Sequence, residues 1–269
     1  MKKLEVLITT MHQQDFSIIQ KMNIQSDVIL ANHCDNTSVD EYCFDGVHTA
    51  KMISTTTRGL SKNRNIAMLY SSDDADYIMF SDDDLTFFDG YEEAVLQEFE
   101  KHPKAQVIKF GLNNVGVKRK TSQGSCKSFF KANRRNVTSS GTWCLAIKKE
   151  ILLKKNMHFN EYFGAGTENY CGEDTLFLQE LINKKIKMFF SPVTIADINQ
   201  DETCWFEGYN EKYFRVSGMV LATAYPKLAN LLAIRSAYKF SKRKSCNMKF
   251  KAILKCYKQG IRQVKRDIK

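Results

Sequence analysis

The chain has 269 residues, of which 43% are hydrophobic, as is ordinary for a globular protein with one large domain or two small ones. Three prolines, 13 glycines and the absence of any serine-, glycine- or proline-rich tract exclude a long flexible linker. No apolar run approaches the roughly 20 residues that cross a bilayer, and the N-terminus MKKLEVLITT is too soon polar for a signal peptide.

Charge and cysteine content narrow the class further. The eight cysteines form no CxxC pair, so reduced thiols of a cytoplasmic protein explain them better than disulfides. Residues 235–269 contain 13 Lys or Arg and one acid, Asp267, for a net charge of +12. Residues 1–234 therefore carry −2 of the total of +10. We expect a nearly neutral body with a basic C-terminal extension.

Short apolar runs alternate with amphipathic segments over the first 110 residues. Strands are expected at Leu4–Thr9, Asp27–Ala31, 47–54, Asp76–Ser81 and Ala105–Phe110. Helices are expected at 15–22, from an N-cap at Ser61 along an apolar face that ends at Tyr70, and at Tyr91–Lys101. Continuous apolar strands that alternate with helices are typical of a parallel sheet with helices on both faces. The sequence therefore predicts a doubly wound α/β fold of the nucleotide-binding type.

The segment YIMFSDDDLTFFDGY, residues 77–91, places three consecutive aspartates at the end of an apolar strand. In such sheets ligands bind beyond the carboxyl ends of the strands. Carboxylate oxygens suit Mg²⁺ or Mn²⁺, whose shell is completed by water and substrate phosphates. Strand alternation places Asp82 and Asp84 on one side, so we expect Asp84 to bind the metal and Asp82 or Asp83 to bind a ribose hydroxyl. An acidic loop that faces solvent is the alternative.

Gly172-Glu173-Asp174 stands at the start of a helix expected over Asp174–Asn183. Acidic residues in the first turn of a helix offset its dipole and need no chemistry to explain them. A carboxylate at the rim of a pocket can instead act as a general base. The residues alone leave both interpretations open.

The segment RGLSKNRN, residues 58–65, places two arginines beside the N-terminus of a predicted helix. Guanidinium groups and the free amides of a helix N-terminus suit the phosphates or the base of a nucleotide. An exposed basic helix face would have the same sequence. Arg58 and Arg64 are therefore candidates for a nucleotide site.

Together and in this order, the motifs resemble the family 2 glycosyltransferases of the GT-A fold, particularly bacterial enzymes that build capsular, exopolysaccharide or O-antigen repeats. The matching segments lie roughly within residues 4–217 and are LEVLITT, VILANHCDN, RGLSKNRNIAM, YIMFSDDDLTF, SSGTWCLAIKKEIL, FNEYFGAGTENYCGEDTLFLQEL and TCWFEGYNEKYF. The resemblance implies a Rossmann-like GT-A domain at 1–234 with a central, mostly parallel sheet. It also implies transfer of a sugar, with inversion, from a nucleotide-diphosphate donor, typically a UDP-hexose, to a hydroxyl of a saccharide or polyprenyl-linked saccharide.

The resemblance also assigns roles to individual residues. The donor site would be formed by Thr9, Asp35, Arg58, Arg64, Asn65, Asp82 and Asp83. Asp84, with Asp82, would hold Mn²⁺ or Mg²⁺, and Asp174 would be the base with Glu173 beside it. Inversion in one displacement needs a base across the pocket from the metal, because the acceptor attacks the face opposite the departing diphosphate. That requirement explains two acidic motifs far apart in the sequence.

One departure from the family pattern concerns the metal. Many GT-A enzymes supply a further metal contact downstream of the base, often a histidine, but all five histidines here precede Asp174. Asp197 or Asp201 would have to replace that ligand, or water and phosphate would complete the shell. Metal dependence is therefore less firmly predicted than the fold.

The two tryptophans, Trp143 and Trp205, are candidates for stacking against a sugar, because each is an amphipathic ring near a predicted loop. Packing in the core is the commoner role of tryptophan. The polar neighbours of Trp205 favour it over Trp143 as an acceptor contact.

Residues 235–269 are expected to form a basic amphipathic helical extension. Its apolar residues are spaced among the cations as on helices, and they are Tyr238, Phe240, Met248, Phe250, Ile253, Leu254, Tyr257 and Ile261. Such helices bind anionic membranes, which would place the protein on the inner face of the cell membrane near a lipid-linked acceptor. Packing of the apolar side on the catalytic domain is the alternative. Nucleic acid is not an expected partner, since no zinc-finger spacing or RNP motif is present.

Two other functional classes compete with this interpretation. A nucleotidyltransferase that acts on sugar phosphates would share the nucleotide fold and the acidic metal site. It would be expected to carry a glycine-rich, basic phosphate loop after the first strand, where this chain has TTMHQQ. A non-catalytic basic module that binds a membrane or nucleic acid is the other alternative. Binding of UDP and Mn²⁺ distinguishes that module from an enzyme.

Overall fold

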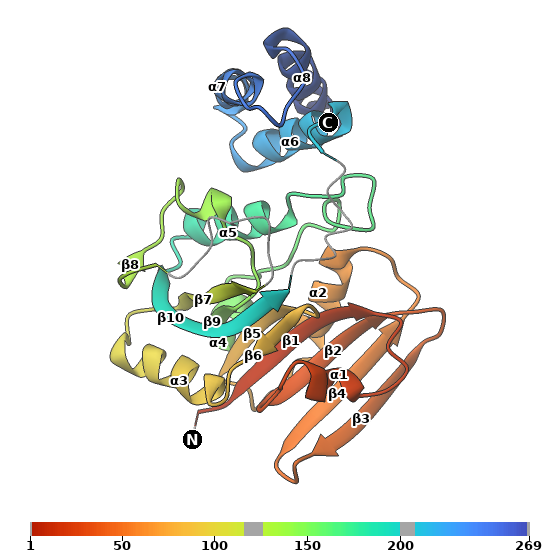
Figure 1. The fold of residues 1–269 in the computed structure, drawn as a ribbon, viewed down its shortest axis with the longest axis vertical. Coiled ribbons are helices and arrows are strands. Elements are labelled where there is room, and N and C mark those ends of the chain that lie inside the picture. Colours follow the sequence, from red (N-terminus) through yellow and green to blue (C-terminus); the bar gives the residue numbers. More distant parts are fainter. Residues whose placement is uncertain (1, 116–125, 200–207, 268–269) are drawn as a thin grey trace.

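The computed structural model describes residues 2–115, 126–199 and 208–267 (Figure 1). Within these residues one sheet contains the strands β1 (Leu4–Met11), β2 (Asp27–His33), β3 (Ser38–Phe44), β4 (His48–Thr55), β5 (Tyr77–Asp82), β6 (Leu85–Phe87), β7 (Val107–Val115), β8 (Phe130–Lys131), β9 (Leu145–Lys148) and β10 (Met188–Asn199). Their order across the sheet is β3-β4-β2-β1-β5-β9-β7-β10-β6, and β8 pairs with β10 outside this path.

Most strands of the sheet point the same way. Parallel pairing joins β4, β2, β1 and β5 into one block and β7 and β10 into another. β9 lies between the two blocks and is antiparallel to both β5 and β7, so the blocks share one direction. β3 and β6 are antiparallel strands at the two edges. The prediction of a mostly parallel sheet is confirmed.

Helices cover both faces of this sheet, as predicted (Figure 1). They are α1 (Ser17–Lys21), α2 (Leu60–Leu69), α3 (Tyr91–Lys101), α4 (Lys149–Lys154) and α5 (Glu173–Asn183). Successive residues of β1 face opposite sides: Val6 packs in a core with α1 and α3, and Leu7 packs in a second core with α2, α4 and α5. Ligands of such sheets bind at the carboxyl ends of the parallel strands, and here Asp82 stands at the end of β5 on that edge.

Helix α2 differs from the sequence-based expectation in both its start and its buried face. It begins at Leu60, and Ser61 does not cap it, because Ser61 Oγ donates a hydrogen bond to the backbone oxygen of Phe163 (2.6 Å). Leu69, expected on the apolar face, is 79% exposed, whereas Arg64 is buried. The helix therefore turns a cation toward the sheet.

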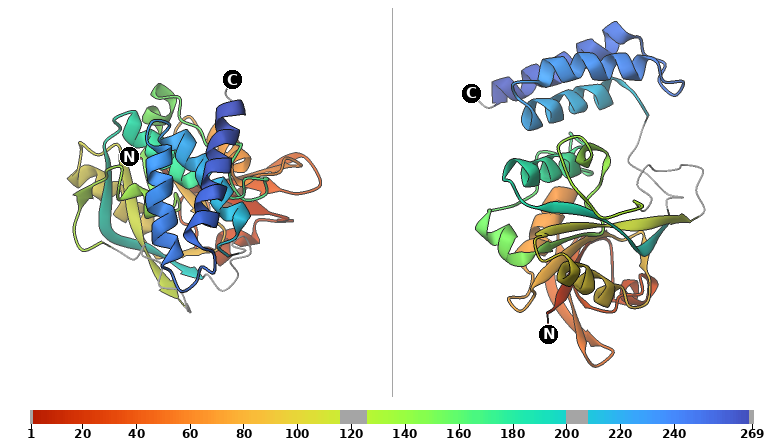
Figure 2. Two further views of the ribbon diagram at one scale, coloured as in Figure 1. Left: turned by 90° about the horizontal axis from the view of Figure 1, so that it is seen from above. Right: turned by 90° about the vertical axis from the view of Figure 1, so that its left-hand side faces the viewer.

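Three further helices, α6 (Glu211–Ala224), α7 (Ala229–Ser241) and α8 (Phe250–Asp267), form a group with its own core. α6 lies between the other two helices and the rest of the protein (Figures 1 and 2). Because α7 crosses position 234, the division expected between 1–234 and 235–269 falls inside a helix, and the helical group begins at Glu211. No helix of the described residues is long and apolar enough to span a membrane.

The helical group packs against the start of α5. Gly172 precedes α5 with φ = 108°, a conformation that favours glycine. A Cβ at this position would lie 2.3 Å from Cγ2 of Val220 in α6. Only glycine fits here, so the position of α6 is fixed directly beside Glu173 and Asp174.

Candidate active site

The aspartate run stands at the carboxyl end of β5, next to β1. β5 ends at Asp82, and Asp83 and Asp84 form the turn to β6, so strand alternation does not place Asp82 and Asp84 on one side as expected. Thr10, near the end of β1, donates from Oγ1 to Asp83 Oδ2 (2.7 Å). Asp83 therefore faces β1.

Asp84 is the exposed member of the run, while Asp82 and Asp83 are half-buried. Asp84 is exposed as a residue, but the surrounding protein desolvates its carboxyl group, and this desolvation, followed by the negative charges of Asp82 and Asp83, raises the pKa of Asp84 to about 7. Three neighbouring carboxyl groups therefore repel one another at the end of β5. A divalent cation bound by Asp84 would relieve this repulsion.

Arg64 connects this run to the second acidic motif. Its Nη2 donates to Asp82 Oδ1 (2.9 Å) and its Nη1 donates to Asp174 Oδ1 (2.7 Å). Glu173 Oε1 lies 3.8 Å from Nη1. Burial disfavours the charged guanidinium, but the carboxylates of Asp174, Asp82 and Glu173 outweigh it and raise the pKa of Arg64 above its ordinary value. Two motifs from distant parts of the chain therefore meet at one permanently charged group.

Asp174, in the first turn of α5, is held through one of its two oxygens. Oδ1 accepts hydrogen bonds from Arg64 and from Thr142 Oγ1 (2.7 Å), which comes from the segment before β9. Among the described residues, none donates a side-chain hydrogen bond to Oδ2. Asp174 is also partly accessible to solvent. A fixed carboxylate with one accessible oxygen can accept a proton from a hydroxyl group.

Glu173 is in a different environment although it is adjacent. Its side chain is buried, and Oε2 has no hydrogen-bond partner among the described residues. Burial, followed by the charge of Asp174, raises the pKa of Glu173 to about 8 against the opposing effect of Arg64. Glu173 is therefore mostly protonated at neutral pH. Asp174, and not Glu173, presents the accessible carboxylate.

Three of the expected donor-binding residues lie at this same edge. Thr9 is paired with Asp82 across β1 and β5, and its buried Oγ1 has no partner among the described residues. Asp35 follows β2, Arg58 precedes α2, and both are exposed. The side chains of Asp35 and Arg58 are free to contact a ligand, whereas Thr9 Oγ1 is covered by the protein.

Two others are engaged within the protein. Arg64 binds the carboxylates described above. The amide of Asn65 donates to the backbone oxygen of Phe159 (3.0 Å) and accepts from the backbone nitrogen of Phe159 (2.8 Å). Arg64 therefore positions the acidic groups, and Asn65 positions the segment at Phe159, instead of presenting free donors to a nucleotide.

Sequence reasoning missed three residues at the site. Thr10 and Thr142 contribute single hydroxyl groups, for which the sequence has no recognisable pattern. Lys109 is a buried cation in β7, and burial lowers its pKa to about 8 while Cys144, Asp174 and other charges oppose that shift. Lys109 could have been found from the sequence, because a lysine inside the apolar run AQVIKFGL is unusual.

Of the two tryptophans and the two candidates for a further metal ligand, the structure describes one each, Trp143 and Asp197. Trp143 is half-buried, its backbone oxygen accepts from Lys109 Nζ, and this Nζ lies 4.4 Å from its ring centroid. Trp205 and Asp201 lie outside the described residues. Asp197 in β10 is paired with Thr86 in β6. Within residues 2–115, 126–199 and 208–267, no group of three or more His, Cys, Asp or Glu side chains could hold a metal.

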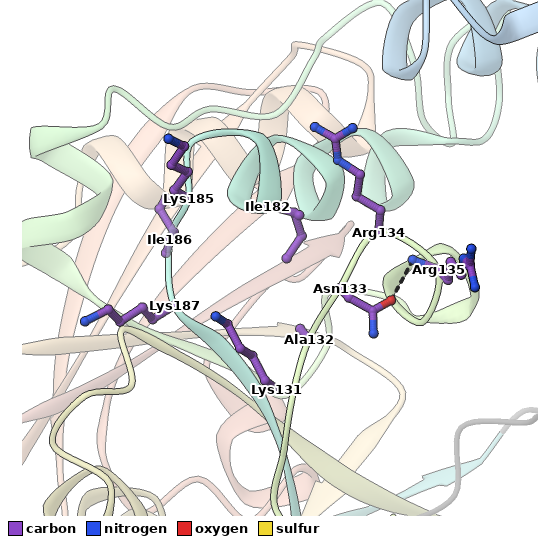
Figure 3. Close-up of a pocket in the computed structure, with 9 residues that line it drawn as sticks. All are labelled: Lys131, Ala132, Asn133, Arg134, Arg135, Ile182, Lys185, Ile186 and Lys187. Atoms are coloured by element: carbon purple, nitrogen blue, oxygen red, sulfur yellow. Dashed lines mark hydrogen bonds between the residues drawn. The ribbon is translucent and has the colours of Figure 1, made fainter.

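A cationic hollow of about 850 Å³ lies apart from the acidic residues, between the segment at β8 and the C-terminal end of α5 (Figure 3). It is lined by Lys131, Ala132, Asn133, Arg134, Arg135, Ile182, Lys185, Ile186 and Lys187. Cations near the C-terminal end of a helix offset its dipole. Neither Asp82 nor Asp174 lines this hollow, so it is not part of the acidic centre.

A doubly wound sheet with a strand-end aspartate run, faced by a second carboxylate across a buried arginine, defines a protein of the GT-A class. Residues 27–157 match the model of the family described as Glycosyl transferase family 2. The match includes Asp82–Asp84 and ends before Asp174. The matched segment, just under half of the chain, is similar to the family 2 glycosyltransferases. No curated protein matches it in sequence.

Solved structures of S. aureus TarS share the fold. TarS 1-349 in complex with UDP-GlcNAc has a TM-score of 0.62 and 15% identity, covering 90% of this chain and 74% of that one. The complex with UDP has a TM-score of 0.60 and 15% identity, with 89% and 72% coverage. A longer TarS structure also has a TM-score of 0.60 and 15% identity; 90% of this chain matches it, but only 44% of its own length is covered.

Proposed function

We propose that this protein is a family 2 glycosyltransferase and transfers a hexose, with inversion, from a UDP-sugar to a hydroxyl of a saccharide or lipid-linked saccharide in the synthesis of a surface polysaccharide. The observation that carries this proposal is the bridge from Asp82 through Arg64 to Asp174, which unites a strand-end aspartate run and an accessible carboxylate at one edge. The UDP-GlcNAc and UDP complexes of TarS support the class of donor.

The leaving side of the reaction is assigned to the end of β5. The carboxylate of Asp84, with the second oxygen of Asp82, suits Mn²⁺ or Mg²⁺, and the pKa of Asp84 is raised by desolvation and then by the neighbouring carboxylates, both of which a bound cation would offset. When bound, the metal neutralises the charge that develops on the departing diphosphate. The exposed side chains of Asp35 and Arg58 are available to the nucleoside and its phosphates, and Thr9 lies beside Asp82 with its Oγ1 buried.

The attacking side is assigned to the first turn of α5. Arg64 and Thr142 fix Oδ1 of Asp174, which leaves Oδ2 to take the proton of the acceptor hydroxyl as it attacks. Arg64 binds Asp174 through Nη1 and Asp82 through Nη2, so one guanidinium fixes the position of the base relative to the metal-binding carboxylates. A base held in a fixed position beside the donor site suits a single displacement.

The competing classes are less well supported. A nucleotidyltransferase would need a glycine-rich phosphate loop after β1. The segment that follows β1 here begins with His12, Gln13 and Gln14, and Gln13 Nε2 donates to Oγ1 of Thr10 (3.0 Å), which is bound to Asp83. A non-catalytic basic module would not require the hydrogen-bonded carboxylate arrangement around Arg64.

The test is a screen of UDP-sugars for metal-dependent hydrolysis and transfer, with Asp84→Asn and Asp174→Asn as variants. We expect Asp84→Asn to lose donor affinity, measured by calorimetry with UDP and Mn²⁺. We expect Asp174→Asn to bind the donor but to fail in transfer. Asp73→Asn is the matched control, since its side chain is fully exposed. Unchanged turnover in Asp174→Asn would remove the assigned base, and a wild type that binds no UDP would favour the non-catalytic module.

A further inference from the structure

Helix α7 has its apolar residues distributed in an unusual way. A helix that packs on a protein normally buries its large apolar side chains. In α7 the fully buried residues are the alanines Ala229, Ala233 and Ala237, whereas Leu231 is 66% exposed and Tyr238 is 61% exposed. The helix therefore packs inward through the methyl groups of its alanines and through Phe240 near its end, and it presents Leu231, Ile234 and Tyr238 outward.

The outward side chains form one continuous stripe. Leu231, Ile234 and Tyr238 follow the spacing i, i+3, i+7, which places them on one face of a helix. Leu228, just before the helix, is also exposed. None of these residues contributes to the core of the helical group. α7 lies on the side of α6 away from the sheet (Figures 1 and 2), and the stripe on it is exposed to solvent.

Helix α8 does not share this property, although the sequence suggested that it would. Its residues Ile253, Tyr257 and Ile261 are buried in the core with α6. Tyr257 also shares a hydrogen bond with Ser236 of α7 (2.9 Å between the two hydroxyl oxygens). Packing on the protein therefore accounts for the apolar side of α8, and only α7 keeps an uncovered one.

The charge around the stripe identifies what covers it. Residues 227–266 contain 13 Lys or Arg and no Asp or Glu. Arg235 and Lys239 are exposed on α7 beside the stripe, and Lys242 Nζ lies 5.7 Å from the Tyr238 ring. A second copy of this chain would bring like charges together, which disfavours a dimer through this face. Leucine, isoleucine and tyrosine interspersed with exposed cations are instead typical of helices that lie on anionic membranes.

We propose that α7 docks this protein onto the surface of an anionic lipid bilayer. Leu231, Ile234 and Tyr238 enter the headgroup region, and the cations of α7 and α8 contact the lipid phosphates. Binding to lipid depends on the helical group alone. Its use, to hold Asp174 near a lipid-linked acceptor through the contact of α6 with Gly172, rests on the proposed function.

The apolar contribution is tested with the full chain and vesicles of phosphatidylcholine, with or without phosphatidylglycerol. Wild type is expected to co-sediment only with the anionic vesicles and to be released by salt. Leu231→Gln/Tyr238→Gln should weaken binding by about tenfold or more, because burial of each apolar side chain adds to the affinity. Leu69→Gln/Tyr70→Gln is the matched control, since this exposed pair ends α2. It should bind like wild type.

The cationic contribution is tested in the same assay. Arg235→Gln/Lys239→Gln should weaken binding and reduce its salt dependence, while Lys185→Gln/Lys187→Gln in the cationic hollow removes the same charge elsewhere and should have a smaller effect. Equal losses from both pairs would indicate non-specific attraction and overturn the assignment to α7.

Three other results would also overturn the proposal. The first is that the wild-type protein does not bind anionic vesicles. The second is that the wild-type protein is a dimer and that Leu231→Gln/Tyr238→Gln dissociates it. The third is that Leu231→Gln/Tyr238→Gln binds vesicles as well as wild type does. Vesicle binding is measured without donor, and hydrolysis of UDP-sugar is measured without vesicles. If Leu231→Gln/Tyr238→Gln loses vesicle binding but still hydrolyses UDP-sugar, the membrane proposal is tested separately from the proposed function.

Discussion

Replacement of Arg64 by methionine is the most direct test of how the site is held together. The substitution keeps an apolar stem of similar length but removes the charge that Asp82 and Asp174 share. Breaking a fully buried ion pair costs about 3–5 kcal/mol, whereas an exposed pair contributes less than about 1 kcal/mol. Arg64 is 3% exposed, but Asp82 and Asp174 are 34% and 23% exposed. We therefore expect a loss of about 2–3 kcal/mol in the free energy of unfolding, between these limits.

Chemical denaturation at neutral pH, followed by circular dichroism, measures this loss. Arg58→Met is the matched control, because it makes the same replacement at an exposed position just before the same helix. Such a surface change should alter stability by no more than about 0.5 kcal/mol. If Arg64→Met and Arg58→Met are equally stable, Arg64 does not hold the two acidic motifs together, and the reasoning about the site is refuted.

Three further changes test other parts of the site. Burial and the charge of Asp174 raise the pKa of Glu173 to about 8, from 4.5 in the unfolded chain. Stability contributed by this group is therefore fully present below pH 4.5 and is lost as the pH rises to about 8. Glu173→Gln should show a flatter dependence of unfolding free energy on pH across that window, and equal slopes would contradict it. Thr142→Val removes one donor to Asp174, so kcat should fall with little change in donor KM, and an unchanged kcat would exclude that role. Gly172→Ala should lower stability by about 2 kcal/mol or more, with partial recovery on Val220→Ala, in thermal unfolding; a variant as stable as wild type would contradict the tight contact.

The sequence predicted those helices and strands whose buried residues follow a regular spacing within the element itself. Helix α3 has the expected bounds, Tyr91–Lys101, because one apolar face and polar flanks define it. Strands β1, β2 and β5 were recognisable as continuous apolar runs. Strand β3 was missed, since its residues from Val39 to Cys43 are all exposed and only its pairing with β4 makes it a strand.

The site was predictable in its acidic residues but not in what holds them. A run of like charges at a strand end and a pair of acids at a helix start are visible in the sequence, and the structure brings Asp82 and Asp174 to one guanidinium. The burial of Arg64 was not predictable, because periodicity assigns the apolar Leu69, and not a cation, to the inner face. The carboxylates that stabilise a buried arginine belong to other elements, and a local pattern does not reveal them.

The reversed direction of β9 determines how the site could be altered. Because β9 runs against β5 and β7, its first residues lie at the edge where its neighbours end, and Thr142 reaches Asp174 from there. Cys144, just ahead of β9, still donates to the backbone oxygen of Phe80 and accepts from the backbone nitrogen of Phe110, so the sheet extends beyond the strand's first residue. Thr142 is buried, and its hydroxyl is bound to Asp174. An exchange at position 142 therefore acts on the base itself, whereas the donor side at the end of β5 is reached from other strands.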